Sequence, residues 1–212
     1  MQDALKCFNG ILSRPITPWA RLLLVLAVVP LALSFTQPLW SIRMFAPQYP
    51  KGLELSIYAY TIEGGNEGRD LQEINTLNHY IGMRKLDKVE FSDLEWIPFA
   101  IGALALLALR VALIGDVRSL VDLAVLTSYF SAFSAARFVF KLYTYGHNLD
   151  PTAAIKMEPF MPAILGTKQI ANFTTSSQLH AATFLIGAFA TTVAVLTVWH
   201  LFYAPREVST TT

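Results

Sequence analysis

The residues of this chain that could do chemistry are methionines and histidines outside its most apolar stretches. Apart from Met1, every methionine lies in one of two more polar segments: Met44, Met83, Met157 and Met161. Two of the four histidines lie there as well. Thioether sulfur and imidazole together suit Cu(I) better than zinc or magnesium, because a soft ion prefers soft ligands. We therefore expect a copper site formed by five residues: His79, Met83, His147, Met157 and Met161.

The spacing of these residues supports the copper hypothesis in part. His79 and Met83 are four residues apart, so a helix would place both on one face. Met157 and Met161 have the same spacing, but Pro159 between them disfavours a helix, and an extended loop would have to bring both sulfur atoms inward. The alternative for each methionine is a packing role, because its flexible side chain fills irregular gaps.

Other chemistries lack the residues that they need. The single cysteine, Cys7, excludes an intramolecular disulfide and a multi-cysteine metal site. Without a C-x-x-C-H run, no covalent haem is expected. The sequence has no Gly-rich phosphate loop, H-E-x-x-H motif or G-x-S-x-G motif, so we do not expect an enzyme. A net charge of +1 gives no electrostatic footprint for nucleic acid.

Four charged residues are further candidates for the site. Arg137 and Lys141 are four residues apart near the end of the third apolar stretch, and Asp150 and Glu158 lie in the segment that follows. The two basic side chains could neutralise these carboxylates or an anionic ligand. Alternatively, they could anchor lipid headgroups, since long basic side chains near the end of a span reach toward the interface.

Four apolar stretches must position these residues. A helix needs about 20 apolar residues to cross the hydrocarbon core of a bilayer, and four stretches qualify: residues 21–40, 96–114, 120–143 and 179–203. Tryptophans and tyrosines lie near their ends, as amphipathic rings prefer the membrane interface. The first stretch has no convincing cleavage site after it, so we expect a retained anchor rather than a signal peptide.

The two longer segments, residues 41–95 and 144–178, are expected to form one small cap of mixed structure on the membrane surface. Residues 53–62 alternate between apolar and polar types, which predicts a strand. Asp70 followed by Glu73 is typical of a helix start, and Gly82 is a suitable end.

The second segment carries three prolines and is expected to be ordered but irregular. The predicted fold class is thus an all-α integral membrane protein with four transmembrane helices and a small mixed cap formed by two long loops.

Basic residues predict the orientation. Lys6, Arg14 and Arg21 precede the first span, and cytoplasmic segments carry an excess of lysine and arginine. Arg118 and Arg206 agree, although the segment of residues 41–95 itself carries six basic residues. The predicted cytoplasmic parts are residues 1–20, 115–119 and 204–212. Both long segments are then extracytoplasmic.

Several runs in the long segments resemble a known family. They are APQYPKGL (Ala46–Leu53), INTLNHYIGM (Ile74–Met83), HNLDPTAAIKMEPFMP (His147–Pro162) and GTKQIANFTT (Gly166–Thr175). Together they resemble small bacterial membrane proteins encoded near genes for copper-dependent respiration, such as nitrous oxide reductase clusters. The resemblance covers less than half of the chain and identifies no catalytic residue. It implies a bacterial inner membrane and a copper enzyme nearby.

The sequence therefore predicts an accessory inner-membrane protein for a copper-dependent respiratory enzyme. It would handle copper, assist assembly or deliver electrons on the extracytoplasmic side. The alternative is a non-catalytic structural subunit of a larger membrane redox complex. In both cases the expected partners are membrane lipid and a redox protein that contacts the cap.

Overall fold

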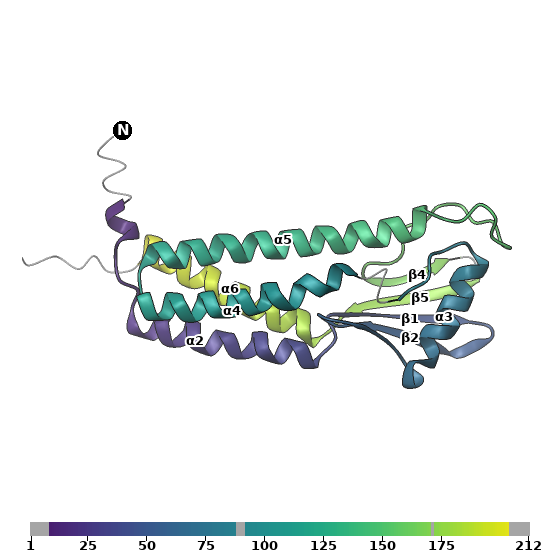
Figure 1. Ribbon diagram of the computed structural model, residues 1–212, viewed down its shortest axis with the longest axis horizontal. Helices are drawn as coiled ribbons and strands as arrows, with labels where there is room; N and C mark the ends of the chain where they lie inside the picture. Colours follow the sequence, from purple (N-terminus) through teal and green to yellow (C-terminus); the bar gives the residue numbers. More distant parts are fainter. Residues whose placement is uncertain (1–8, 88–91, 171, 204–212) are drawn as a thin grey trace, which may run out of the picture.

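The structure is a computed structural model that describes residues 9–87, 92–170 and 172–203. Four long helices form a bundle, and a β-sheet domain extends from one end of it (Figure 1). The four are long and apolar enough to cross a membrane, which indicates a membrane protein. They are α2 with the short helix η1 (Pro18–Leu33 and Ser34–Thr36), α4 (Trp96–Ile114), α5 (Val117–His147) and α6 (Ala181–Phe202).

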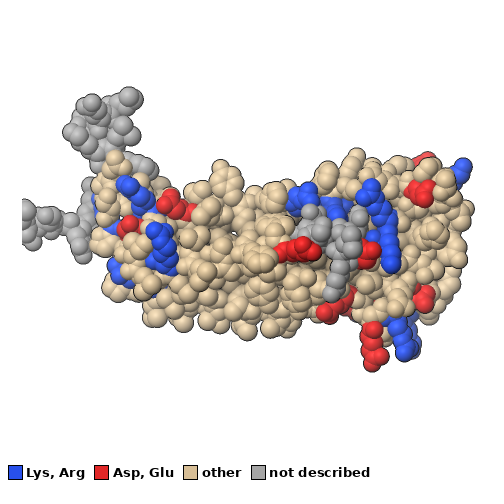
Figure 2. All heavy atoms as spheres, viewed as in Figure 1, with Lys and Arg blue, Asp and Glu red and all other residues tan. Residues whose placement is uncertain are grey.

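Charged side chains avoid the middle of the bundle. On the face shown in Figure 2, lysine, arginine, aspartate and glutamate gather toward the two ends of the long axis and leave a band without charge over the helices. A charged side chain is costly in the hydrocarbon core of a bilayer, so charges collect on either side of it. The uncharged band therefore marks the part of the protein that suits a membrane.

The sheet domain is the main departure from the expected fold. Its five antiparallel strands have the order β3-β2-β1-β5-β4. Their bounds are β1 (Trp40–Ala46), β2 (Tyr49–Ile57), β3 (Ile62–Gly64), β4 (Gly166–Ile170) and β5 (Phe173–Leu179). The prediction of an all-α fold with a cap of two loops is therefore wrong.

The second long segment supplies β4 and β5, where we expected irregular structure. The sequence of β5, FTTSSQL, has a polar residue at most positions, so it lacks the apolar alternation that indicates a strand. Its strand conformation instead follows from pairing with β1, in which Trp40 faces Leu179 and Met44 faces Thr175. That partner lies more than a hundred residues earlier in the chain, beyond the reach of a local pattern.

The first long segment matches its prediction more closely. The expected strand at residues 53–62 corresponds to two strands, β2 and β3, because β2 ends at Ile57 and the chain turns before Ile62. The expected helix is α3 (Arg69–Tyr80), which follows the short helix η2 (Asn66–Gly68). Asp70 does not cap this helix. It accepts hydrogen bonds from the Glu54 N–H at 2.9 Å and from Asn66 Nδ2 at 2.7 Å.

Successive side chains in a strand point to opposite faces, so the sheet has an apolar inner face and a polar outer face. The inner face carries Trp40, Leu55 and Ile57, and it packs on Ile74 of α3 and Tyr145 of α5. The outer face is polar, with Arg43 and Glu54 forming an ion pair at 2.5 Å between neighbouring strands. The hydrogen bond to Glu54 and the negative charge of Glu54 favour the charged form of Arg43, so the pKa of Arg43 lies above its usual value.

Helix α5 joins the bundle to the sheet domain. Its 31 residues correspond to roughly 46 Å, which exceeds the hydrocarbon core of about 30 Å. The last turns of α5 therefore pass over the inner face of the sheet. There the ring of Phe138 meets the ring of Trp40 edge-on, with centroids 5.2 Å apart.

The chain after α5 is fastened back onto the domain at three places. The Asp150 N–H donates to the Gly82 carbonyl at 2.8 Å, and the Ile155 N–H donates to the Tyr80 carbonyl at 2.9 Å. The Phe160 N–H then donates to the Gly146 carbonyl at 2.9 Å. This loop thus connects the end of α3 to the end of α5 before it continues into β4.

Gly146 allows the closest of these approaches, which gives a testable prediction. A Cβ atom at this position would lie 1.8 Å from the Phe160 carbonyl oxygen. We expect Gly146→Ala to displace the loop, lower the melting temperature and expose residues 148–165 to limited proteolysis. The matched control is Gly102→Ala in α4, where a Cβ meets nothing within 4 Å. Equal proteolysis of the two variants would contradict the role of Gly146.

Candidate functional site

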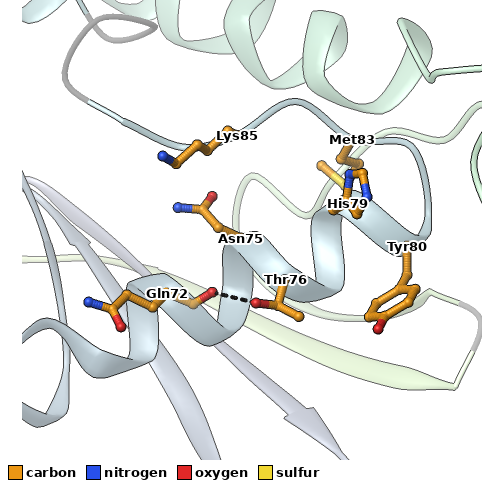
Figure 3. Close-up of a pocket in the computed structure, with 7 residues that line it drawn as sticks. All are labelled: Gln72, Asn75, Thr76, His79, Tyr80, Met83 and Lys85. Atoms are coloured by element: carbon orange, nitrogen blue, oxygen red, sulfur yellow. Dashed lines mark hydrogen bonds between the residues drawn. The ribbon is translucent and has the colours of Figure 1, made fainter.

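A cavity of about 620 Å³ lies along the polar face of α3. Its lining comes from α3 and from the loop that follows: Gln72, Asn75, Thr76, His79, Tyr80, Met83 and Lys85 (Figure 3). The α3 residues recur at intervals of three and four, so they share one side of the helix. The opposite side carries Ile74, which packs under the sheet. The amphipathic pattern of α3 therefore forms the cavity wall.

The loop wall of the cavity is held in place by Asn75 of α3. Its side-chain Nδ2 donates to the Leu86 carbonyl at 2.9 Å, and its Oδ1 accepts from the Leu86 N–H at 2.7 Å. The Met83 N–H also donates to the Asn78 carbonyl at 2.8 Å. These bonds satisfy backbone groups that would otherwise lack partners. They fix the loop, and with it Met83, against the helix.

His79 and Met83 both line this cavity, but not on one helix face as their spacing predicts, because α3 ends at Tyr80 and Met83 lies in the loop that follows. Their side chains overlap in the view of Figure 3. The pair offers one imidazole nitrogen and one thioether sulfur, a donor set that suits Cu(I). Among the described residues, no group of three or more histidine, cysteine, aspartate or glutamate side chains could hold a metal ion. Harder ions such as zinc therefore find no such set there.

The other three predicted copper ligands lie elsewhere. The ring of His147 stacks on Tyr143 with centroids 3.8 Å apart, and its Nδ1 lies 2.9 Å from the Tyr143 carbonyl. Met157 and Met161 lie in the loop after α5 and do not line the cavity. The Met161 carbonyl accepts a hydrogen bond from Lys168 Nζ at 2.7 Å. The structure thus brings together two of the five candidates.

Of the two candidate carboxylates, Asp150 interacts electrostatically with His79 of the cavity. It accepts hydrogen bonds from the Thr152 hydroxyl at 2.6 Å and from the Thr152 N–H at 2.8 Å. These bonds lower the pKa of Asp150, and positive charge on His79 lowers it further. The second effect places Asp150 within electrostatic reach of the cavity. Glu158, in contrast, is exposed on the loop.

Arg137 and Lys141 lie on the outer part of α5, away from this cavity. The guanidinium carbon of Arg137 is 6.0 Å from the ring centroid of Phe140. Lys141 lines a second cavity of about 90 Å³, which lies between the sheet, α3 and α5. Both residues are therefore at the junction of the bundle and the sheet domain, one helical turn apart.

The second cavity contains a residue that the sequence analysis missed. Asn78 is 2% exposed, and its Nδ2 has no hydrogen-bond partner in the part of the chain that the structure describes. The other lining side chains are mostly apolar and include Trp40, Phe138 and Met83. A signal was present in the sequence, since Asn78 follows Ile74 by four residues and so interrupts the apolar face of α3. Met83 is the residue that the two linings share among the described residues.

Comparison of the chain with models of known protein families, with curated proteins and with solved structures finds no match. The resemblance to proteins encoded near copper-respiration genes therefore stays a prediction from the sequence, and the site must be interpreted from its own geometry.

The unpaired amide of Asn78 predicts a stabilising substitution. Replacing Asn78 by leucine removes a buried donor without a partner and fills apolar space with apolar atoms. We expect Asn78→Leu to raise the free energy of unfolding by about 1–2 kcal/mol. Thermal unfolding in detergent measures this change. Asn75→Leu is the control, because it removes two hydrogen bonds from the same helix and should destabilise the protein.

Asp150 predicts a dependence of loop docking on pH. Its folded pKa is lowered, so its stabilising effect is present above the ordinary aspartate pKa of about 4 and is lost as the pH falls through the folded value. We expect faster hydrogen exchange at the Ile155 amide, which bonds Tyr80, below that range. Asp150→Asn should abolish this acid-dependent increase and Glu158→Gln should preserve it. An increase unchanged in Asp150→Asn would assign the effect to another group.

Proposed function

We propose that the protein is an accessory membrane protein that binds Cu(I) at His79 and Met83 and serves a copper-dependent respiratory enzyme. One observation carries this proposal: the imidazole of His79 and the thioether of Met83 line the same cavity, and the loop that bears Met83 is held by hydrogen bonds to the Asn75 side chain and to the Asn78 carbonyl. A preorganised pair of ligands loses less freedom on binding than two independent side chains.

The position of the cavity supports handling of copper rather than permanent storage. It lies in the sheet domain, beyond the uncharged band of the bundle, and its volume of about 620 Å³ leaves room for a further ligand beside the metal. Cu(I) tolerates low coordination numbers, so a partner could supply a third donor and remove the ion by ligand exchange. Lys85 and Gln72, on the cavity wall, would contact such a partner first.

The orientation in this proposal follows from the basic residues at the far end of the bundle. Arg14, Arg21, Arg110 and Arg118 lie near the turn between α4 and α5 at that end, which is the pattern of a cytoplasmic face. The sheet domain would then be extracytoplasmic, with both termini in the cytoplasm. In an oxidising compartment thioethers remain available as copper ligands, whereas thiols form disulfides. The bacterial inner membrane is the location that the sequence resemblance implies.

The alternative function, a structural subunit of a larger redox complex, is favoured by a different observation. Strand β4 is at one edge of the sheet, and four of its five residues are exposed. An exposed edge presents unpaired backbone groups to which an extended segment of another protein can add. Metal analysis after mild purification separates the two functions, because a structural subunit would carry a stoichiometric partner and no copper of its own.

The test of copper binding is a Cu(I) titration of the purified protein against a competing chelator. We expect a dissociation constant below about 1 µM, and a loss of tenfold or more in affinity for both Met83→Leu and His79→Gln. Leucine keeps the apolar wall that Met83 provides to the second cavity, so the sheet domain should stay folded.

Met44→Leu is the matched control, since Met44 lines the second cavity but not the first. Met157→Leu, Met161→Leu and His147→Gln show whether the larger predicted ligand set takes part when copper is present. Binding weaker than micromolar in the unmodified protein, or binding unchanged in Met83→Leu combined with His79→Gln, removes the copper proposal.

A further inference from the structure

Four arginines surround the turn between α4 and α5, at the end of the bundle opposite the sheet domain. The Arg14 carbonyl accepts a hydrogen bond from the Val117 N–H at 3.0 Å. Arg21 Nη2 donates to the Gly115 carbonyl at 3.5 Å. Arg110 precedes this turn in α4, and Arg118 follows it in α5. Three separate parts of the chain therefore bring arginines to this turn.

Asp116, in this turn, interacts electrostatically with two of the four arginines. Its carboxylate accepts a hydrogen bond from the Ser119 N–H at 2.8 Å and so caps α5. A hydrogen bond from the Ser119 side chain is the largest cause of the lowered pKa of Asp116, and the Ser119 N–H and the positive charges of Arg118 and Arg110 lower this pKa further. Both guanidinium groups are thus within electrostatic reach of the first turn of α5.

Positive charge exceeds negative charge at this end. Against the four arginines, the described chain places two carboxylates here, Asp116 and Asp122, and Asp116 is occupied as a helix cap. None of the four arginines forms an ion pair with another described residue. The ion pair between Arg43 and Glu54 lies in the sheet domain, at the other end of the molecule. Arg110 and Arg118 are exposed. The cluster therefore keeps a positive charge that the described protein does not neutralise.

Aromatic side chains near this cluster indicate that it would lie at the headgroup layer of a membrane. Trp19 is 46% exposed and contacts Trp199 with ring centroids 6.3 Å apart, and Trp199 stacks on Tyr203 at 5.8 Å. Tryptophan and tyrosine prefer the headgroup layer of a bilayer. The first turns of α2 and α5 lie at this end too, where their N–H groups favour negative charge.

We propose that the cluster of Arg14, Arg21, Arg110 and Arg118 binds the phosphate of an anionic phospholipid in the leaflet opposite the sheet domain. Arginine suits this ligand because its planar guanidinium can donate two parallel hydrogen bonds to one phosphate. Basic pockets between transmembrane helices bind lipid headgroups in this way. A phosphate held there bridges α2, α4 and α5 and reduces the mutual repulsion of the arginines.

The test compares thermal unfolding in vesicles of phosphatidylcholine with unfolding in vesicles that also contain about a quarter phosphatidylglycerol. We expect the melting temperature of the unmodified protein to be higher by about 3 °C or more in the anionic vesicles. The double variant Arg110→Gln with Arg118→Gln should lose at least half of this shift. These two side chains are exposed, so neither substitution disturbs the bundle core.

The matched control carries the same loss of charge in the sheet domain: Lys51→Gln with Arg69→Gln, both exposed. It should keep the full shift. A third variant, Arg110→Lys with Arg118→Lys, keeps the charge and removes the bidentate geometry, and it should keep only part of the shift. A shift that is equal in the unmodified protein and in the glutamine variant overturns the proposal, as does no shift in the unmodified protein.

Inorganic phosphate separates the lipid from a soluble anion. We expect millimolar inorganic phosphate added to phosphatidylcholine vesicles to leave the melting temperature unchanged. The same stabilisation by free phosphate would replace the lipid by a soluble phosphate as the ligand and so overturn the lipid proposal. Native mass spectrometry gives an independent readout, with phosphatidylglycerol retained by the unmodified protein at least threefold more often than by the glutamine variant.

Discussion

The pairing of β1 with β5 is the interaction on which the rest of the structure depends. These strands follow α2 and precede α6 with only a few residues between, so their ladder continues to the helix ends. The His180 N–H donates to the Leu39 carbonyl at 3.0 Å, and the Thr183 hydroxyl donates to the same carbonyl at 2.7 Å. Because two helices and two strands share one hydrogen-bonded seam, the sheet domain is anchored directly on the bundle.

Histidines of α6 secure this arrangement at both ends. At the sheet end, His180 Nε2 lies 2.7 Å from the buried hydroxyl of Ser41. At the other end, His200 is 1% exposed, with its Nδ1 at 2.8 Å from the Leu196 carbonyl. Its Nε2 accepts the Thr17 N–H at 3.1 Å, so Nδ1 must carry the ring proton. Both side chains therefore serve to join α6 to its neighbours, and neither is part of the cavity on α3.

Sequence patterns identified those elements whose signals are local. The four apolar stretches and the helix at residues 69–80 could be predicted because length and periodicity within one segment define them. His79 and Met83 do line one cavity, but through the loop after α3 rather than through the shared helix face that their spacing predicts. The polar strands β4 and β5 could not be predicted, since their conformation depends on pairing with a distant strand that fixes the register. The stacking of His147 on Tyr143 is a local contact, and it was missed because α5 continues to His147, four residues beyond the predicted span.

The shared wall at Met83 has a chemical consequence for the protein. Met83 lines both the cavity on the polar side of α3 and the apolar cavity under the sheet. Oxidation to the sulfoxide would convert a flexible apolar side chain into a polar one, and the new oxygen would have to face water or enter the space under the sheet. Oxidation by peroxide would therefore change the lining of both cavities at one residue. Reduction of the sulfoxide would restore the original side chain in both cavities. The packing of the sheet domain would thus depend on the oxidation state of Met83.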